Sequence, residues 1–294
     1  MKRREFLLAS AATVAAGKLF AEEKPVPHQP ICVFTKPLQS LTYDEMADRI
    51  AELGFDGVEA TIRDGGHIEP KDVEVELPKM VDALKKRGLE ITIMTSSIND
   101  PNDTMTETQL KVAAELGIQR YRMKYLRYDL NKPVIAQLNN WRPQLRDLAA
   151  MNADLGITAI YQNHAGRDFF GAPLWDLGYA LNGISKNHIG IAYDIRHATV
   201  EGGMSWPVTL NALTPYLNTV YVKDFQWIDK KPKNVPLGEG NIDASFFEIL
   251  RKSGFNGPIS LHEEYLDHRK PELVPKHLSA MKKDFATLKR LLKG

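Results

Sequence analysis

Short apolar segments alternate with longer amphipathic segments from about residue 30 to the C-terminus. The apolar runs are rich in β-branched residues, which is typical of buried strands. We predict strands at ICVFT (31–35), GVEATI (57–62), EITIMT (90–95), RYRMKYL (120–126), TAIYQNH (158–164), IGIAYDI (189–195), TVYVKDF (219–225) and GPISLHEEY (257–265).

The segments between these runs have the spacing of amphipathic helices, and most end in the glycine expected at a helix C-terminus. Examples are TYDEMADRIAELG (42–54), ELPKMVDALKKRG (76–88), TETQLKVAAELG (106–117) and DASFFEILRKSG (243–254). Eight strand–helix units predict an α/β fold, a single-domain (β/α)8 TIM barrel over residues 31–294. A doubly wound open sheet is the alternative, but the sequence has no G-x-G-x-x-G after the first predicted strand.

The first residues, MKRREFLLASAATVAAGKLFA, have a different character. Arg3 and Arg4 precede a weakly apolar, alanine-rich stretch, which is typical of a twin-arginine export signal. We therefore predict a signal peptide at 1–21, a linker at 22–30 and a periplasmic protein. A frayed N-terminal helix is the alternative.

Composition narrows the classes of partner. The 38 basic and 37 acidic residues give a net charge of +1 without a basic stripe, which argues against nucleic acid as a partner. No later segment is apolar enough to cross a membrane. Cys32 is the single cysteine and lies in an apolar run, so we expect it to pack in the core.

Polar residues recur where the predicted strands end. Alternate residues of a barrel strand face inward, and functional groups gather at the C-terminal ends. The inward-facing residues would be Glu59, Thr61, Arg63, Arg122, Lys124, Gln162, His164, Tyr221, Lys223, Ser260, His262 and Glu264. Asp194 closes the sixth strand, His197 follows it, and His67 lies in the loop after the second strand. Several converging polar strand ends predict a site.

The order and spacing of several motifs resemble the xylose-isomerase-like sugar phosphate isomerase/epimerase superfamily, which also includes inosose dehydratases and endonuclease IV. The motifs are Asn163-His164, DIRHA (194–198), YVKDF (221–225), PLGEGNID (236–243) and the GPISLHEEY of the last strand. An endonuclease would need a His-rich three-metal cluster and a basic surface, and neither is visible in the sequence.

The resemblance implies one divalent metal, held by Glu, Asp, His and Glu in the barrel mouth and compatible with Mn²⁺, Mg²⁺, Co²⁺ or Zn²⁺. This sequence keeps Asp194 but has Gln162 for the first Glu, Tyr221 for the His and His262 for the last Glu, with Glu264 two residues on. A rearranged shell of Asp194, His262 and Glu264, with His164 or His197, is one hypothesis. The other is that no metal binds and that Gln162 lines the site without acting as a ligand.

Family chemistry is proton removal next to a carbonyl, so we assign candidate roles on that basis. The candidate acid–base groups are His164, His262 and Glu264, and Lys223 could stabilise an enolate by its charge. The candidate substrate-binding residues are Arg63, His67, Lys124, Gln162, His197, Tyr221 and Trp227, together with Trp175 and Trp206 as stacking residues. Structural alternatives remain, since Lys223 could form a structural ion pair and His197 could merely brace Asp194.

Export shifts the expected substrate, because sugar phosphates are cytoplasmic intermediates. The first hypothesis is an isomerase or epimerase of a non-phosphorylated sugar or keto-sugar, with a small-molecule carbohydrate as its partner. A 3-keto-glycoside lyase or hydrolase would use the same proton removal. A non-catalytic periplasmic sugar-binding protein is the third hypothesis.

Overall fold

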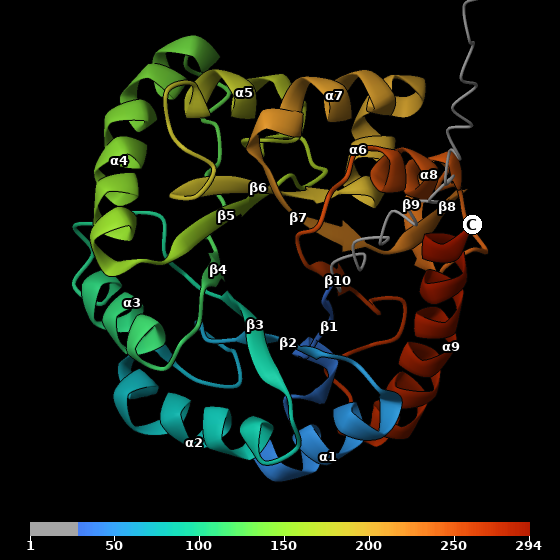
Figure 1. Cartoon of the computed structure of the whole chain (residues 1–294). Coiled ribbons are helices and arrows are strands. Elements are labelled where there is room, and N and C mark those ends of the chain that lie inside the picture. The colour runs from blue at the N-terminus through green and yellow to red at the C-terminus, as the bar shows by residue number, and fades with distance from the viewer. Residues whose placement is uncertain (1–28) are drawn as a thin grey trace, which may run out of the picture.

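The structure, a computed structural model, describes residues 29–294. Eight parallel strands in this part of the chain close into a barrel in the order β1-β10-β7-β6-β5-β4-β3-β2, and helices surround it (Figure 1). The barrel strands are β1 (Ile31–Phe34), β2 (Gly57–Thr61), β3 (Glu90–Thr95), β4 (Arg120–Arg122), β5 (Thr158–Gln162), β6 (Ile189–Asp194), β7 (Leu217–Val222) and β10 (Ile259–Leu261). The predicted single-domain (β/α)8 TIM barrel is confirmed.

The helices follow the strands in the order that the amphipathic segments predict. They are α1 (Tyr43–Leu53), α2 (Val73–Lys85), α3 (Thr106–Glu115), α4 (Val134–Leu155), α5 (Trp175–Leu181), α6 (Ile195–Gly202), α7 (Trp206–Leu213), α8 (Ser245–Lys252) and α9 (Val274–Lys293). Short 3₁₀ helices occur at η1 (Lys36–Leu38), η2 (Pro70–Asp72), η3 (Gly203–Ser205), η4 (Thr214–Tyr216) and η5 (Pro271–Leu273).

Helix α1 shows how local sequence sets these boundaries. The Thr42 side chain accepts a hydrogen bond from the Glu45 backbone N–H, and the Glu45 carboxylate accepts one in return from Thr42 N–H. This capping box satisfies two backbone donors that the first turn leaves unpaired. Met46 and Ile50 point into the core, and Gly54 ends the helix with a φ of 82°.

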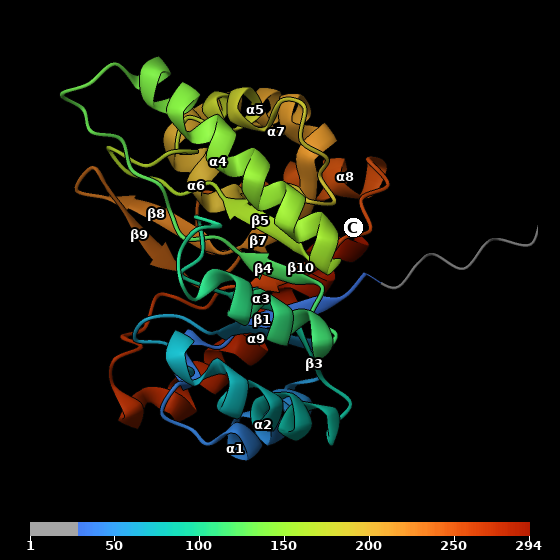
Figure 2. The same cartoon turned by 90° about the vertical axis from the view of Figure 1, so that its left-hand side faces the viewer.

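Two strands differ from the prediction. Strand β4 ends at Arg122, because the next residues leave the sheet and Lys124 N–H bonds instead to the Ile98 carbonyl. The predicted strand at 219–225 is interrupted at Lys223. Asp224 then begins β8 (Asp224–Ile228), which pairs antiparallel with β9 (Lys231–Val235) in a hairpin that projects at the left of Figure 2.

Asp224 organises the loop that follows this hairpin. Its carboxylate accepts hydrogen bonds from the backbone N–H groups of Gly238, Gly240 and Ile242 at 3.0–3.1 Å. The loop approaches so closely that a Cβ on Gly240 would lie 2.2 Å from Asp224 Oδ1. Only glycine fits there, so the PLGEGNID motif is a structural wrapping of Asp224.

The hydrophobic core has two layers. The larger layer fills the space between the barrel and the helices. A smaller cluster inside the barrel consists of Cys32, Ile93, Ile160, Ala192 and Tyr221. Cys32 is fully buried there, which confirms its expected packing role.

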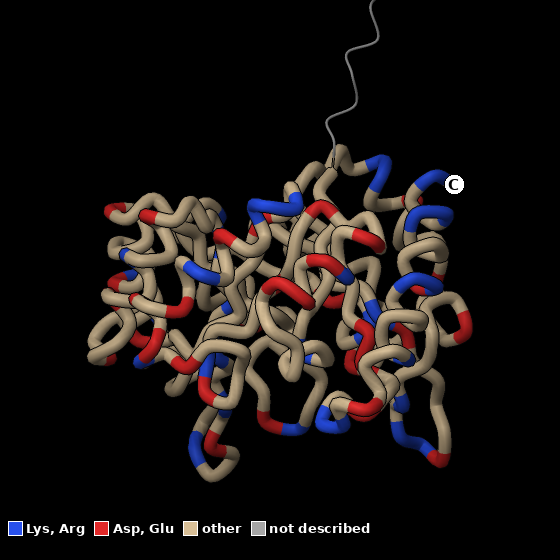
Figure 3. The backbone as a smooth tube through the Cα atoms, turned by 90° about the horizontal axis from the view of Figure 1, so that it is seen from below, with Lys and Arg blue, Asp and Glu red and all other residues tan. Residues whose placement is uncertain are grey.

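The predicted signal at 1–21 lies outside the described residues, as do residues 22–28 of the predicted linker. Between residues 29 and 294, no helix combines the length and the apolar character that crossing a membrane requires. Basic and acidic residues are interspersed along the backbone in Figure 3, in keeping with the absence of a basic stripe in the sequence.

Candidate functional site

A buried carboxylate, Glu59 of β2, lies at the floor of the barrel mouth, where the strands end. Ser260 and Thr95 hydroxyls donate to it at 2.6 Å, and the Tyr221 hydroxyl donates at 3.1 Å. His262 Nε2 lies 2.8 Å from Glu59 Oε2. Side chains from four strand ends therefore meet at one anion that has no contact with solvent.

From Glu59, ionisable groups of alternating charge cross the barrel. His262 lies between Glu59 and Glu264, with its Nδ1 3.7 Å from Glu264 Oε2. Lys223 Nζ then lies between Glu264 Oε2 at 2.7 Å and Asp194 Oδ2 at 3.3 Å. Each cationic group in this row has a carboxylate on both sides, so the row compensates the cost of burying its charges.

The pKa values follow from these contacts. Burial would lower the pKa of Lys223, but Asp194 and Glu264 outweigh it, and the net shift is upward. Burial likewise opposes ionisation of Glu264, yet Lys223 and His262 hold the pKa of its carboxyl well below the ordinary value. Burial also opposes ionisation of Glu59, but the charges of His262 and Arg122 outweigh it and lower the pKa of Glu59 to about 2. Lys223, Glu264 and Glu59 are therefore all charged at neutral pH.

A cavity of about 130 Å³ opens above this row of charges. Its wall combines four lysine and arginine side chains with a single carboxylate, together with aromatic and polar groups. The lining residues are Phe34, Lys36, Arg63, Arg122, Tyr125, Gln162, His164, Lys223, His262 and Glu264.

Gln162 bridges the two halves of the site. Its Oε1 accepts hydrogen bonds from Arg122 Nη1 and the Tyr125 hydroxyl. Its Nε2 donates to Asp194 Oδ2 at 2.7 Å. The amide thus uses its oxygen on one side and its N–H on the other, a division that a carboxylate could not reproduce.

These donors do not fit a divalent metal ion. The Gln162 oxygen is already taken by two donors, the Tyr221 hydroxyl and His262 Nε2 are both directed at Glu59, and the Lys223 ammonium separates the carboxylates of Asp194 and Glu264. Over residues 29–294, no three His, Cys, Asp or Glu side chains are placed to share an ion. In this structure the Lys223 ammonium lies between the carboxylates of Asp194 and Glu264, where members of the hypothetical shell would converge.

His164 follows β5 and lines the cavity. Its Nδ1 lies 2.9 Å from the Ala165 carbonyl, so Nδ1 carries the proton and Nε2 keeps its lone pair. Burial, and then the charge of Lys223, lowers the pKa of His164 to about 4. The imidazole is therefore neutral at physiological pH. Its ring packs against that of His197, with 4.1 Å between centroids.

Three predicted site residues lie behind the cavity wall. Asp194 and Tyr221 are fully buried beneath Lys223 and Glu59, respectively. His197 is buried in the first turn of α6, where its backbone N–H donates to Asp194 Oδ1 at 3.1 Å. None of the three lines the cavity, so in this structure they position other side chains.

The structure does not bring the other predicted residues to the cavity. Lys124 is exposed, because β4 ends before it. His67 Nε2 is engaged with the Leu41 carbonyl at 3.0 Å, so its ring braces a loop. Trp227 is 51% exposed on the hairpin, Trp175 is also exposed, and Trp206 packs inside against Phe246. These residues do not line the cavity, and their contact with substrate stays a prediction.

Other wall residues were missed by the sequence interpretation or had no role assigned. Phe34, Lys36 and Tyr125 were not singled out, and Arg122 was only expected to face inward, as was Glu59, which lies below the wall. Phe34 ends β1 and stacks on His262, and Lys36 lies two residues after the end of the strand. The in-phase polar residue after each strand was the available signal. It failed at Tyr125, because the chain turns after Arg122.

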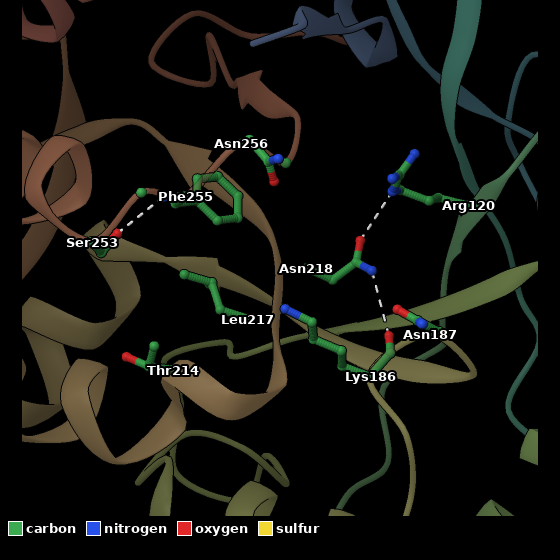
Figure 4. Close-up of a pocket in the computed structure, with 11 residues that line it drawn as sticks. Arg120, Lys186, Asn187, Thr214, Leu217, Asn218, Ser253, Phe255 and Asn256 are labelled. Atoms are coloured by element: carbon green, nitrogen blue, oxygen red, sulfur yellow. Dashed lines mark hydrogen bonds between the residues drawn. The ribbon is translucent and has the colours of Figure 1, made fainter. Parts of the chain in front are cut away.

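Figure 4 shows a second hollow, of about 270 Å³, at the opposite end of the barrel. Arg120, at the start of β4, donates there to Asn218 Oδ1 at 3.0 Å, and Asn218 in turn donates to the Lys186 carbonyl. In barrels of this kind the N-terminal face serves stability. The row of buried charges lies at the other end, and we place the functional site there.

Comparison with known proteins agrees with the barrel fold. A family model described as xylose isomerase-like TIM barrel matches residues 47–284. No curated protein sequence matches the chain.

Solved structures of similar fold cover most of the chain. An L-ribulose 3-epimerase shares 14% identity, with a TM-score of 0.70 over 90% of this chain and 95% of that one. The 3-keto-D-glucoside 4-epimerase YcjR of E. coli shares 19% identity, with a TM-score of 0.66 over 90% and 100%. The probable 3-DHS dehydratase AsbF of Bacillus anthracis shares 14%, with a TM-score of 0.69 over 89% and 99%.

Proposed function

Because this chain belongs to the xylose isomerase-like TIM barrel family, we propose that it is a sugar isomerase or epimerase that removes a proton next to a carbonyl group. Its substrate is a non-phosphorylated sugar or keto-sugar. The observation that carries the proposal is the Lys223 ammonium, held between two carboxylates in the same cavity as a neutral imidazole. The similar folds of an L-ribulose 3-epimerase and a 3-keto-D-glucoside 4-epimerase support it.

His164 accepts the proton in this mechanism. Its Nε2 has no hydrogen-bond partner among residues 29–294, and its low pKa keeps it unprotonated before substrate binds. An imidazole with a pKa of about 4 is a weak base in the free protein. The negative charge that develops on the substrate oxygen raises that pKa as the reaction proceeds, which makes the proton transfer easier.

Lys223 stabilises the enolate. Its raised pKa keeps it protonated, and Asp194 and Glu264 fix it in place before the reaction starts. A charge that is already oriented in a buried site stabilises the developing oxyanion without reorganisation. The mechanism therefore uses only groups that the chain supplies.

Glu264 is the second acid–base group. It follows β10, whereas His164 follows β5, and Lys223 follows β7, which lies between those strands in the barrel order. The two groups thus flank Lys223 on either side. A substrate bound against Lys223 is exposed to a proton acceptor on one side and to the Glu264–His262 pair on the other, as epimerisation requires.

Proton NMR in D₂O tests this function. Purified protein is incubated with a panel of pentoses, hexoses and their keto derivatives, and deuterium incorporation next to the carbonyl is followed together with new products. We expect exchange with an isomerised or epimerised product in the wild type and none in His164→Gln. Loss of a leaving group would identify a lyase instead, and binding without any exchange would identify a binding protein.

We also propose that residues 1–21 direct export to the periplasm. Fractionation of cells that express either the wild-type protein or a variant lacking Arg3 and Arg4 tests this proposal.

A further inference from the structure

We propose, as an inference that rests on the sugar isomerase or epimerase function, that the substrate is an acidic sugar whose carboxylate binds between Lys36 and Arg63. Both side chains line the cavity, from the segments that follow β1 and β2. Neighbouring strands of the barrel therefore place these two cations side by side on one wall.

Arg63 is a partly buried guanidinium without an anionic partner. Its guanidinium forms no hydrogen bond and no ion pair with any residue between 29 and 294, whereas its backbone N–H donates to the Ile68 carbonyl at 3.0 Å. Its recorded contact is with the Phe34 ring, whose centroid lies 5.9 Å from Arg63 Cζ. Burial, and then the nearby charge of Arg122, lowers the pKa of Arg63. A guanidinium held in this way is prepared to receive an anion.

Lys36 is nearly as free. Its nearest carboxylate oxygen is Glu264 Oε1 at 3.9 Å, whereas Glu264 Oε2 is occupied by Lys223 at 2.7 Å. Burial lowers the pKa of Lys36, and Arg63, Lys223 and Arg122 lower it further against the opposing effect of Glu264. The lysine thus lies in a positive environment that a bound anion would relieve.

The remaining charges of the wall are already balanced. Arg122 lies 3.6 Å from Glu59 and hydrogen-bonds Gln162, and Lys223 lies between Asp194 and Glu264. A neutral sugar could hydrogen-bond to Lys36 and Arg63 but would leave their charge uncompensated in a half-buried site. A carboxylate neutralises it and matches the planar fork of the guanidinium.

Calorimetric titration tests the proposal without turnover. The ligands are hexuronates and ketogluconates, each compared with the corresponding neutral hexose and with hexose 6-phosphates. We expect the wild type to bind at least one sugar acid about 10-fold or more tightly than its neutral counterpart, as one charge-assisted contact implies. Arg63→Met and Lys36→Met should each weaken that binding by about 10- to 100-fold.

Two further variants serve as controls. Lys71→Met removes an exposed positive charge after the same strand as Arg63 and should leave binding unchanged. Arg63→Lys keeps the charge and should recover part of the affinity, which distinguishes a direct contact from misfolding. Equal affinity for acid and neutral sugars, tighter binding of the phosphates, or no loss in Arg63→Met would overturn the proposal.

The proposed function can fail separately from this inference. Sugar acids that bind through Arg63 but show no deuterium exchange would leave the carboxylate site intact and refute the isomerase. Exchange on neutral sugars alone would support the isomerase and refute the carboxylate site.

Discussion

The Lys223 ammonium lies 2.7 Å from the Glu264 carboxylate. Asp194 holds the same ammonium from the other side at 3.3 Å. In the pattern that the sequence resembles, the side chains at these strand ends surround a divalent cation. Here a covalently attached cation lies between the carboxylates, and it supplies fixed positive charge at the point where an enolate would form.

Replacing Lys223 by methionine removes that charge with little change of side-chain length. We expect kcat/KM to fall by about 10²- to 10³-fold, the usual effect of removing one oxyanion-stabilising donor. Substrate affinity should change much less, because the stabilisation acts mainly in the transition state. Steady-state kinetics with calorimetric binding separates the two effects. Lys71→Met is the matched surface control, and unchanged turnover in Lys223→Met would refute the assigned role.

The rate should depend on the protonation of His164. Its pKa of about 4 means that the imidazole is a free base above that pH and becomes protonated below it. Glu59 and Glu264, whose pKa values are lowered, stay ionised in the same range. We therefore expect kcat/KM of the folded protein to decline as pH falls through about 4, measured alongside circular dichroism. A decline centred near the ordinary histidine value of 6.5 would contradict this environment for His164.

Glu59 should be essential for stability. Glu59→Gln keeps the shape of the side chain but removes the negative charge. His262, Ser260, Thr95 and Tyr221 all hydrogen-bond to that carboxylate. Breaking a buried pair costs about 3–5 kcal/mol, and we expect a loss of that order in the free energy of unfolding from urea titration. An exposed control, Glu74→Gln, should stay within about 0.5 kcal/mol of wild type.

The pKa of Glu59 also predicts how stability depends on pH. Because the folded pKa of about 2 lies below the ordinary value of 4.5, the unfolded chain binds the proton first. The contribution of Glu59 is fully present above pH 4.5 and is lost as pH falls from there toward 2. Urea titrations of the wild type and Glu59→Gln should therefore converge in acid. A constant difference would be inconsistent with this ionised carboxylate.

Gln162→Glu tests whether the amide is required. The new carboxylate would face Asp194 Oδ2, to which Gln162 Nε2 now donates at 2.7 Å. We expect a loss of about 1–3 kcal/mol at pH 7, because a buried hydrogen bond becomes a repulsion. The loss should shrink at lower pH, where the introduced carboxyl takes up a proton. Gln119→Glu, at an exposed position, is the control, and a stabilised Gln162→Glu protein would contradict the arrangement.

The fold was predictable because the local signals and the strand–helix repeat agree. Strand β3 spans Glu90–Thr95, as its β-branched run predicts. Strand ends were less predictable, since alternation continues through residues that leave the sheet. At Lys124 a backbone hydrogen bond to Ile98 decides the outcome, and at Asp224 the side-chain carboxylate accepts hydrogen bonds from a later loop. The sequence does not show these bonds.

The sequence predicted which way the side chains of the site point, but not which other side chains they contact. Alternation placed Gln162, Lys223, His262 and Glu264 on one side of their strands, and these residues line the cavity. That Glu59 would meet side chains from strands more than 150 residues away could not be read from spacing. The same applies to Arg63, whose guanidinium reaches no carboxylate between residues 29 and 294, and to Lys36, whose nearest carboxylate oxygen lies 3.9 Å away.

The most direct test of the central claim measures deuterium exchange next to the substrate carbonyl in protein treated with a chelator, with its metal content determined by mass spectrometry. If Lys223 supplies the charge, exchange in the wild type persists after chelation, does not increase with added Mn²⁺, Co²⁺ or Zn²⁺, and is lost in Lys223→Met. Near-stoichiometric metal that disappears in Asp194→Ala, together with exchange that requires the metal, would contradict the account.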